Sequence, residues 1–504
     1  MKINIPMVKD DSSAEIKRLA EAKDHKKHWK RWGPYVSERQ WATVREDYSA
    51  DGDAWRFFPH EHARSRTYRW GEDGLAGISD NHQRLCFAIG LWNGKDKILK
   101  ERLYGLTNHE GNHGEDVKEL HYYLESTPTH SYMKYLYKYP QTEFPYEKLV
   151  EENSRRSRTE SEYELKDTGI FDEDKYFDVF VEYAKDSQDV DDVLIKITAH
   201  NRGPTDAPLH IIPQFWFRNT WAWFPPGEVE VPQLKKSGPL TMELQHETLG
   251  QRFVHFEAKP KGGARPPELI FTNNESNLQR LFNVPNKSPY VKDAFHEYVI
   301  RGDTAAINQE DFSGTKAAGV YKFDKVPAGG YVEVRVRLNG KQNPSGKEGA
   351  VFKNFDKIVQ DRIKDNEEFY SKLTIDGLNQ DLKGIQRQAL AGMLWSKQWY
   401  CFDQRSWSKG DPIGPPPPPE RTGVRNMAWQ HLYIDTILSM PDKWEYPFFA
   451  AWDLAFHAIP LAIVDVDFAK ENLNLLLREW FLHPNGQIPA YEWNFSDVNP
   501  RKNH

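Results

Sequence analysis

The sequence predicts an α+β protein with more than one domain, in which an antiparallel β-sandwich-type domain precedes a helical region. The chain has 504 residues, more than the roughly 100–200 residues of one typical domain. Apolar residues recur with a period of two from about residue 177 to residue 340, and with a helical period after about residue 350. Strands that precede helices, rather than alternate with them, are typical of separate β and α regions.

The first predicted element is an amino-terminal helical extension over residues 1–32. Lys, Glu, Ala and Arg dominate residues 12–31, and these residue types favour helices. Because the segment is rich in charge, we expect an exposed helix.

Residues 33–345 are expected to form a loop-rich β-sandwich domain. Every second residue is apolar in 193–199 and again in 332–338, which is typical of half-buried strands. Gly, Pro and Asn clusters separate the apolar runs, as they do in sandwiches. Further strands are expected at 177–183, 208–217, 252–258, 268–272 and 319–324.

Residues 346–504 are expected to be helical. Apolar residues follow helical spacing over 385–394, 427–438 and 473–481. Asp467 is a suitable N-cap for the last of these helices.

Composition and charge exclude some classes of partner. The net charge is −7, which does not resemble the basic surface of a nucleic-acid-binding protein. No apolar run has the ~20 residues needed to span a bilayer, and the amino terminus does not resemble a signal peptide. The two cysteines, Cys86 and Cys401, indicate a reducing compartment. We therefore expect a cytoplasmic protein without membrane or nucleic-acid partners, and no cofactor motif is evident.

The candidate catalytic residue is Asp453, a single carboxylate within the apolar run 448–457. Burial disfavours the charged form of a carboxyl group, and a neutral acid can protonate a leaving group. Trp452 and His457 are candidate substrate-binding neighbours, because aromatic rings stack on sugars. The alternative is that Asp453 caps a helix starting at Leu454, which would lower its pKa instead.

A second carboxylate, Glu492, follows in the segment 486–494 and is a candidate catalytic or substrate-binding residue. The alternative is a loop glutamate bonded to backbone amides. The segment also contains neutral hydrogen-bonding groups and aromatic rings of the kind that recognise sugar hydroxyls. These candidate substrate-binding residues are Gln487, Tyr491, Trp493 and Asn494.

Charges and rings also alternate in residues 38–48, where Arg45, Glu46 and Asp47 are candidate sugar-binding residues. A clamp of ion pairs between domains explains the same pattern equally well. The segment 109–113 has the spacing of an H-E-x-x-H zinc motif, which requires a helix. Surrounding Gly and Asn residues favour a loop, so we predict no metal there.

Several long segments resemble glycoside hydrolase family 63, which includes mannosyl-oligosaccharide glucosidases and mannosylglycerate hydrolases. They are 38–48, 73–80, 111–119, 126–132, 452–457 and 486–494. The resemblance implies a β-sandwich-type domain followed by an (α/α)6 barrel. It also implies hydrolysis of α-glycosidic bonds with inversion, and a general-acid role for Asp453.

A complete (α/α)6 barrel requires more residues than follow position 345, so the resemblance implies only the first part of a barrel and a missing late general base. The first hypothesis is an inverting hydrolase of α-linked glucosides or mannosides, acting on an oligosaccharide or small α-glycoside. The second is a non-catalytic carbohydrate-binding or assembly homologue, with self-association through exposed helices. The third is a fragment of a split gene.

Overall fold

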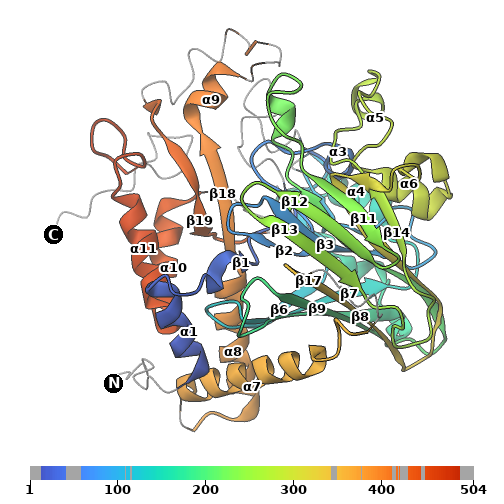
Figure 1. Ribbon diagram of the computed structural model, residues 1–504, viewed down its shortest axis with the longest axis horizontal. Coiled ribbons are helices and arrows are strands. Elements are labelled where there is room, and N and C mark those ends of the chain that lie inside the picture. The colour runs from blue at the N-terminus through green and yellow to red at the C-terminus, as the bar shows by residue number, and fades with distance from the viewer. Residues whose placement is uncertain are drawn as a thin grey trace.

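Two antiparallel sheets pack face to face and dominate the computed structural model (Figure 1). The structure describes residues 13–40, 58–107, 109–113, 116–341, 349–375, 377–410, 412, 416–417, 419, 429–443 and 449–488. Within these residues, the first sheet has six strands in the order β1-β2-β3-β10-β16-β14. Their bounds are β1 Trp32–Gly33, β2 Leu75–Asp80, β3 Leu85–Trp92, β10 Ala207–Phe217, β14 Glu268–Thr272 and β16 Lys316–Val326.

The second sheet has nine strands among the described residues, in the order β15-β11-β12-β13-β17-β9-β8-β7-β6. Their bounds are β6 His121–Ser126, β7 Tyr132–Pro140, β8 Tyr176–Lys185, β9 Val193–Asn201, β11 Gln233–Gly238, β12 Thr241–His246, β13 Gly250–Phe256, β15 Ser313–Gly314 and β17 Tyr331–Asn339. A separate short pair joins β4 (Gly105–Leu106) to β5 (Asp116–Val117).

The main hydrophobic core lies between the two sheets. Phe87 and Ile89 of β3 belong to the same buried cluster as Ile195 and Ile197 of β9. Residues two apart on a strand share one face, so each period-two run supplies an apolar face to this core. The strands predicted within 177–338 are confirmed by β8, β9, β10, β13, β14, β16 and β17.

Short helices lie in the connections and at the amino terminus of this part of the chain. They are α1 Ala14–Lys23, α3 His60–Ser65, α4 Tyr146–Arg155, α5 Leu278–Phe282 and α6 Ala294–Arg301. Several single 3-10 turns accompany them.

The expectation that residues 346–504 form the first part of an (α/α)6 barrel is wrong. Sheets dominate the fold, and the helices of this region do not form a ring of helical hairpins in the described part. A strand pair, β18 (Lys397–Asp403) with β19 (Tyr433–Ser439), lies between the first two helices and the last two, with one short helix between its strands. The helices are α7 Phe355–Leu373, α8 Gln380–Trp395, α9 Gln404–Lys409, α10 Ala451–Val464 and α11 Val466–Leu476.

These later elements pack on the nine-stranded sheet and on one another. Helix α7 contacts β7 and β8, α8 contacts β6, and α10 contacts α8, α11 and β19. In Figure 1, α7, α8, α10 and α11 lie at one side of the molecule, next to α1. Helix α8 confirms the helix predicted at 385–394.

The helix predicted at 427–438 is wrong, because residues 433–439 form strand β19. Ile434 and Leu438 of this strand are buried, whereas Tyr433 at its start is exposed. Residues four apart share a face in a helix and also in a strand, so this spacing fits both periods. The expected N-cap Asp467 is likewise wrong, since Asp465 caps α11.

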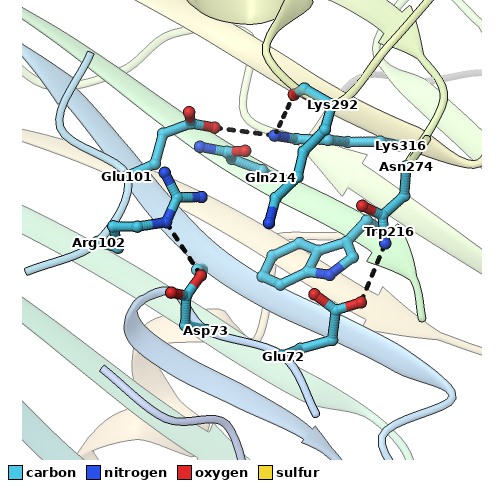
Figure 2. Close-up of a pocket in the computed structure, with 10 residues that line it drawn as sticks. Glu72, Asp73, Glu101, Arg102, Gln214, Trp216, Asn274, Lys292 and Lys316 are labelled. Carbon is cyan, nitrogen blue, oxygen red and sulfur yellow. Dashed lines mark hydrogen bonds and ion pairs between the residues drawn. The ribbon is translucent and has the colours of Figure 1, made fainter. Parts of the chain in front are cut away.

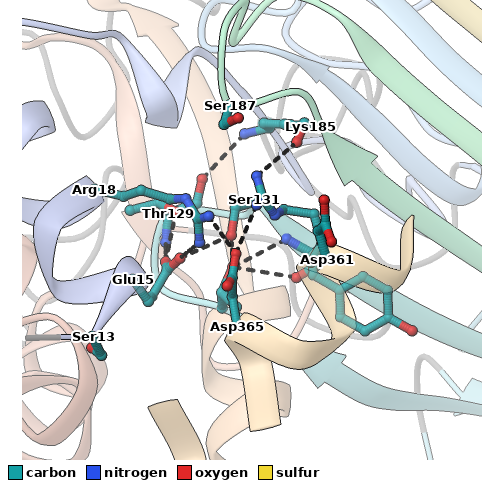
Figure 3. Close-up of polar contacts among 12 residues, drawn as sticks. Ser13, Glu15, Arg18, Thr129, Ser131, Lys185, Ser187, Asp361 and Asp365 are labelled. Atoms are coloured by element: carbon teal, nitrogen blue, oxygen red, sulfur yellow. Dashed lines mark hydrogen bonds and ion pairs between the residues drawn. The ribbon is translucent and has the colours of Figure 1, made fainter. Parts of the chain in front are cut away.

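The amino-terminal helix α1 is less exposed than expected. Glu15 is fully buried, and its carboxylate accepts hydrogen bonds from the Thr129 backbone N–H and hydroxyl and from the Ser131 hydroxyl, at 2.6–2.8 Å. Arg18 pairs with Glu15 and with Asp365 of α7 (Figure 3). Helix α1 is therefore tied both to the nine-stranded sheet and to α7.

One buried carboxylate, Asp465, joins four parts of the chain. It ends α10 and accepts a hydrogen bond from the Phe468 N–H at 3.2 Å, capping α11. Lys397 at the start of β18 and Lys30 from the amino-terminal segment pair with it at 3.2 and 2.8 Å. Burial opposes ionisation of Asp465, but the two lysines outweigh that effect and lower its pKa.

In the part of the chain that the structure describes, no helix combines the length and the apolar character required to cross a bilayer.

Replacing Asp465 with Asn should destabilise the protein by about 3–5 kcal/mol, because it leaves the buried Lys397 ammonium without its counter-charge. The measurement is the free energy of unfolding from urea titration. Asp467→Asn is the matched control, since its pair with Lys23 is exposed and should contribute less than about 1 kcal/mol. Equal effects of the two substitutions would contradict this role of Asp465.

Candidate functional site

The predicted catalytic residue, Asp453, lies in the first turn of α10. The N-cap of α10 is Ala450, and no side chain caps the helix, so Asp453 is not a capping residue. Asp453 is half-buried, rather than enclosed as the sequence suggested.

Exposed aromatic rings flank this carboxylate. Trp452 is 55% exposed and Phe456, one turn later, is 64% exposed. Their ring centroids are 6.0 Å apart in an edge-to-face arrangement. Within the described residues, the Asp453 carboxylate has no hydrogen bond or ion pair. An unpaired acid beside an open aromatic surface is therefore available to an incoming ligand.

His457 lies one helical turn after Asp453 and faces β19. Its Nδ1 is 3.0 Å from the Ser439 hydroxyl. Burial lowers the pKa of His457, although the nearby Asp453 charge acts in the opposite direction. Ser439 in turn donates its backbone N–H to the Asn472 side chain at 3.1 Å, which connects α10, β19 and α11.

Among the other predicted site residues, only Gln487 lies in the described part of the chain, and it makes no hydrogen bond to Asp453. Gln487 lies in a turn after α11, where its side-chain oxygen accepts a hydrogen bond from Asn485 at 2.6 Å. The remaining candidates lie outside the described residues, so the distance between Asp453 and Glu492 stays untested. They are Arg45, Glu46, Asp47, Tyr491, Glu492, Trp493 and Asn494.

Sequence reasoning missed a buried ionic cluster at the six-stranded sheet (Figure 2). Arg102 pairs with Asp73 at 3.0 Å, and Lys316 pairs with Glu101 at 2.8 Å. Asn274 donates to Glu72 at 3.0 Å. These groups enclose a cavity of about 10 Å³, enough for roughly one water molecule.

Burial and neighbouring charges shift the pKa values in this cluster in opposite directions. Burial lowers the pKa of Lys292 to about 7 and raises that of Glu72. Burial also opposes ionisation of Glu101, but Lys316 and Arg102 prevail and hold its pKa at about 2. Since the cavity cannot admit a substrate, the cluster is a structural network. Its members come from distant parts of the sequence, so no local motif could identify it.

A cluster of three carboxylates resembles a metal site, but a lysine ammonium of the protein already lies among them. Asp116, Glu162 and Glu164 place oxygens close enough to bind one ion. The buried Lys118 ammonium pairs with all three, at 3.1 Å from both glutamates. The H-E-x-x-H segment, residues 109–113, forms turns and bends rather than a helix, as expected. The His113 ring lies 3.0 Å from the Glu160 carbonyl oxygen.

No protein-family model matches the sequence. The chain is 49% identical over 526 residues to the uncharacterized protein YMR196W of Saccharomyces cerevisiae. This match covers 97% of the chain and 48% of the yeast protein, so the chain spans about half the length of that relative.

Two solved structures show weak similarity. A bacterial glucoamylase complexed with acarbose has a TM-score of 0.36 and 9% identity, covering 92% of this chain and 52% of the glucoamylase. The family GH92 inverting mannosidase BT2199 from Bacteroides thetaiotaomicron has a TM-score of 0.21 and 6% identity, covering 73% of this chain and 42% of the mannosidase. At these values neither similarity supports an argument about fold or function.

The ionic cluster makes stability depend on pH. The pKa of Glu101 is about 2 in the folded protein and 4.5 in its ordinary, unperturbed state. As the pH falls, the Glu101 carboxylate therefore becomes protonated in the unfolded chain before it does so in the folded protein. The stabilisation is complete above pH 4.5 and is lost as the pH falls toward 2, by roughly 3 kcal/mol.

The test compares urea unfolding of the unsubstituted protein and Glu101→Gln across this range. The difference in unfolding free energy should be largest above pH 4.5 and should narrow toward pH 2. Glu143→Gln, which removes an exposed partner of Lys97, provides a control with little pH-dependent difference. If the difference in unfolding free energy between Glu101→Gln and the unsubstituted protein did not change with pH, the ionised Glu101 would not stabilise the fold.

Proposed function

We propose that the protein is a carbohydrate-active protein of the glycosidase type, and that the amino-terminal turn of α10 forms part of its sugar site. The observation that carries the proposal is the unpaired Asp453 carboxylate beside the exposed rings of Trp452 and Phe456. Aromatic faces bind the apolar faces of sugar rings, and carboxyl groups hydrogen-bond hydroxyls or transfer protons.

In the proposed reaction, Asp453 is the general acid that protonates the glycosidic oxygen of the departing sugar. A sugar ring stacked on Trp452 would displace water from beside this carboxyl group. The second carboxylate of an inverting enzyme activates water on the opposite face of the sugar, roughly 6.5–9.5 Å from the acid. Glu492 is the proposed second carboxylate, and the proposed substrates are α-linked glucosides or mannosides.

The other proposed site residues recognise hydroxyl groups. The His457 ring contacts the Ser439 hydroxyl, and we propose that it positions the first turn of α10 and does not take part in the reaction. The proposed direct contacts are Arg45, Glu46, Asp47, Gln487, Tyr491, Trp493 and Asn494. The proposal places catalysis in residues 346–504, supported by the sandwich domain of residues 33–345 and by the extension of residues 1–32.

A second candidate function, assembly without hydrolysis, is favoured by one specific observation. Ile459, which is 68% exposed, follows Trp452 and Phe456 at helical spacing on α10, and Leu477, just after α11, is 65% exposed. Contiguous exposed apolar surface often marks a protein contact.

Asp453→Asn should lower hydrolysis of nitrophenyl α-glucoside or α-mannoside by roughly 10²–10⁴-fold, because the amide cannot supply the proton. Steady-state release of nitrophenol provides the measurement, and circular dichroism checks the fold. Glu479→Gln, an exposed carboxylate beyond α11, is the control that should retain activity. Full turnover by Asp453→Asn would refute the general-acid assignment.

Trp452→Ala should weaken sugar binding roughly tenfold, since stacking of one ring contributes on the order of 1 kcal/mol or more. Isothermal titration with maltose and methyl α-mannoside measures this change. Sugar binding that depends on Trp452 without any turnover would select the non-catalytic candidate. Unchanged affinity would remove Trp452 from the site.

A further inference from the structure

A polar hollow of about 390 Å³ lies between the amino-terminal segment, β19 and α11. Lys30 and Tyr35 line it from the amino-terminal side, and Asn81 and His82 from the turn between β2 and β3. Its size falls within the ~300–1,000 Å³ that is usual for small-molecule sites.

Part of the lining of the hollow consists of buried side chains. Phe468 and Tyr35 supply aromatic surface, and the Lys397 ammonium lies 3.9 Å from the Phe468 ring centroid. Asp435 is oriented by the Trp399 indole N–H, which donates to it at 2.7 Å. Asn472 accepts a hydrogen bond from the Ser439 backbone N–H, and its amide nitrogen has no partner in the described part of the chain.

Several polar side chains that line the hollow have no hydrogen-bond or ion-pair partner among the residues that the structure describes. These are the side chains of Asn81, Glu471, Asn474 and Arg478. The Nδ1 atom of His82 is buried and has no hydrogen-bond partner. The hollow therefore presents several polar side chains that are free to bind a ligand.

The charges around the hollow indicate the class of ligand. Lys30, Lys397 and Arg478 are cationic, while Asp435 and Glu471 are anionic. Asp465 lies against Lys30 and Lys397 and neutralises part of their charge. Three positive groups therefore face three negative groups, which does not favour a phosphate or another polyanion.

We infer that this hollow binds a neutral, hydroxyl-rich ligand, such as a sugar unit or a short oligosaccharide. Hydroxyl groups donate and accept hydrogen bonds, as do the amides of Asn81, Asn472 and Asn474. The carboxylates accept from hydroxyls, the Arg478 guanidinium donates to them, and Phe468 offers an apolar surface to a ring face.

This inference goes beyond the function proposed for α10, because none of these residues belongs to the Asp453 site. The two sites are neighbours through β19, where Ser439 contacts both His457 and Asn472, and through the packing of α10 on α11. The hollow can bind a sugar whether or not Asp453 catalyses hydrolysis.

The test is saturation-transfer NMR and calorimetric titration of the full chain with maltose, methyl α-mannoside and inorganic phosphate. Neutral sugar should bind saturably. Arg478→Ala and Asn474→Ala should each raise Kd roughly tenfold, as expected for the loss of a ligand hydrogen bond. Lys470→Ala, an exposed substitution on the same helix but outside the hollow, should leave Kd unchanged. Thermal unfolding checks that the variants fold.

Trp452→Ala separates this site from the one on α10. If the hollow is an independent sugar site, Trp452→Ala retains the binding event that Arg478→Ala weakens and affects only the event assigned to α10. Binding lost in Trp452→Ala but retained in both rim variants overturns the inference and supports the α10 site. Absence of saturable sugar binding, or tighter binding of phosphate at the rim, also overturns it. Hydrolysis that depends on Asp453 is measured separately, so failure here leaves the proposed function intact.

Discussion

The ion pairs at Asp465 determine where the carboxy-terminal helices lie on the two-sheet body. This carboxylate is 1% exposed, as is its partner Lys397, so its charge is stabilised by direct contacts rather than by water. It also caps α11 and receives Lys30 from the amino-terminal segment. A buried carboxylate with so many contacts fixes the angle between α10 and α11, because moving either helix would leave a charge unpaired.

Both proposed sites follow from this arrangement. Helix α10 ends at Asp465, and its opposite end presents Asp453 and the aromatic pair. The polar hollow contains Lys30 and Lys397, the two lysines that hold Asp465, and its far wall is α11. The buried pairs of Glu15 and Arg18 add a second attachment of the amino-terminal segment, to α7 and the nine-stranded sheet (Figure 3). The rigid sandwich thus supports a more exposed helical region that carries the candidate chemistry.

The sequence predicted the features that depend on local periodicity. Strands such as 193–201 and 331–339 are identified by alternation, because each buries one face in the core. Helix α8 was predictable because its apolar residues recur at helical spacing and bury one face of the helix. Strand β19 was not, since Ile434 and Leu438 are four residues apart and satisfy both periods. The barrel expectation came from resemblance alone, and the sheet-rich structure with its β18–β19 pair contradicts it.

The polar networks were beyond sequence reasoning because their partners are far apart in the chain. Lys30 and Asp465 are separated by 435 residues, and Glu101 and Lys316 by 215. No motif links such pairs, and each residue alone resembles ordinary surface charge. The rings next to Asp453 were evident from the aromatic run around it, but the exposure of those rings, the partial exposure of Asp453 and its lack of a capping role were not predicted.

A double-mutant cycle between Asp465 and Lys397 tests the central claim most directly. Asp465→Asn, Lys397→Met and the double variant are compared by urea unfolding. We expect a coupling energy of roughly 1.5–3 kcal/mol, because the double variant leaves no buried charge of this pair unmatched. Additive effects, within about 0.5 kcal/mol, would show that this pair does not hold the helices to the sheets.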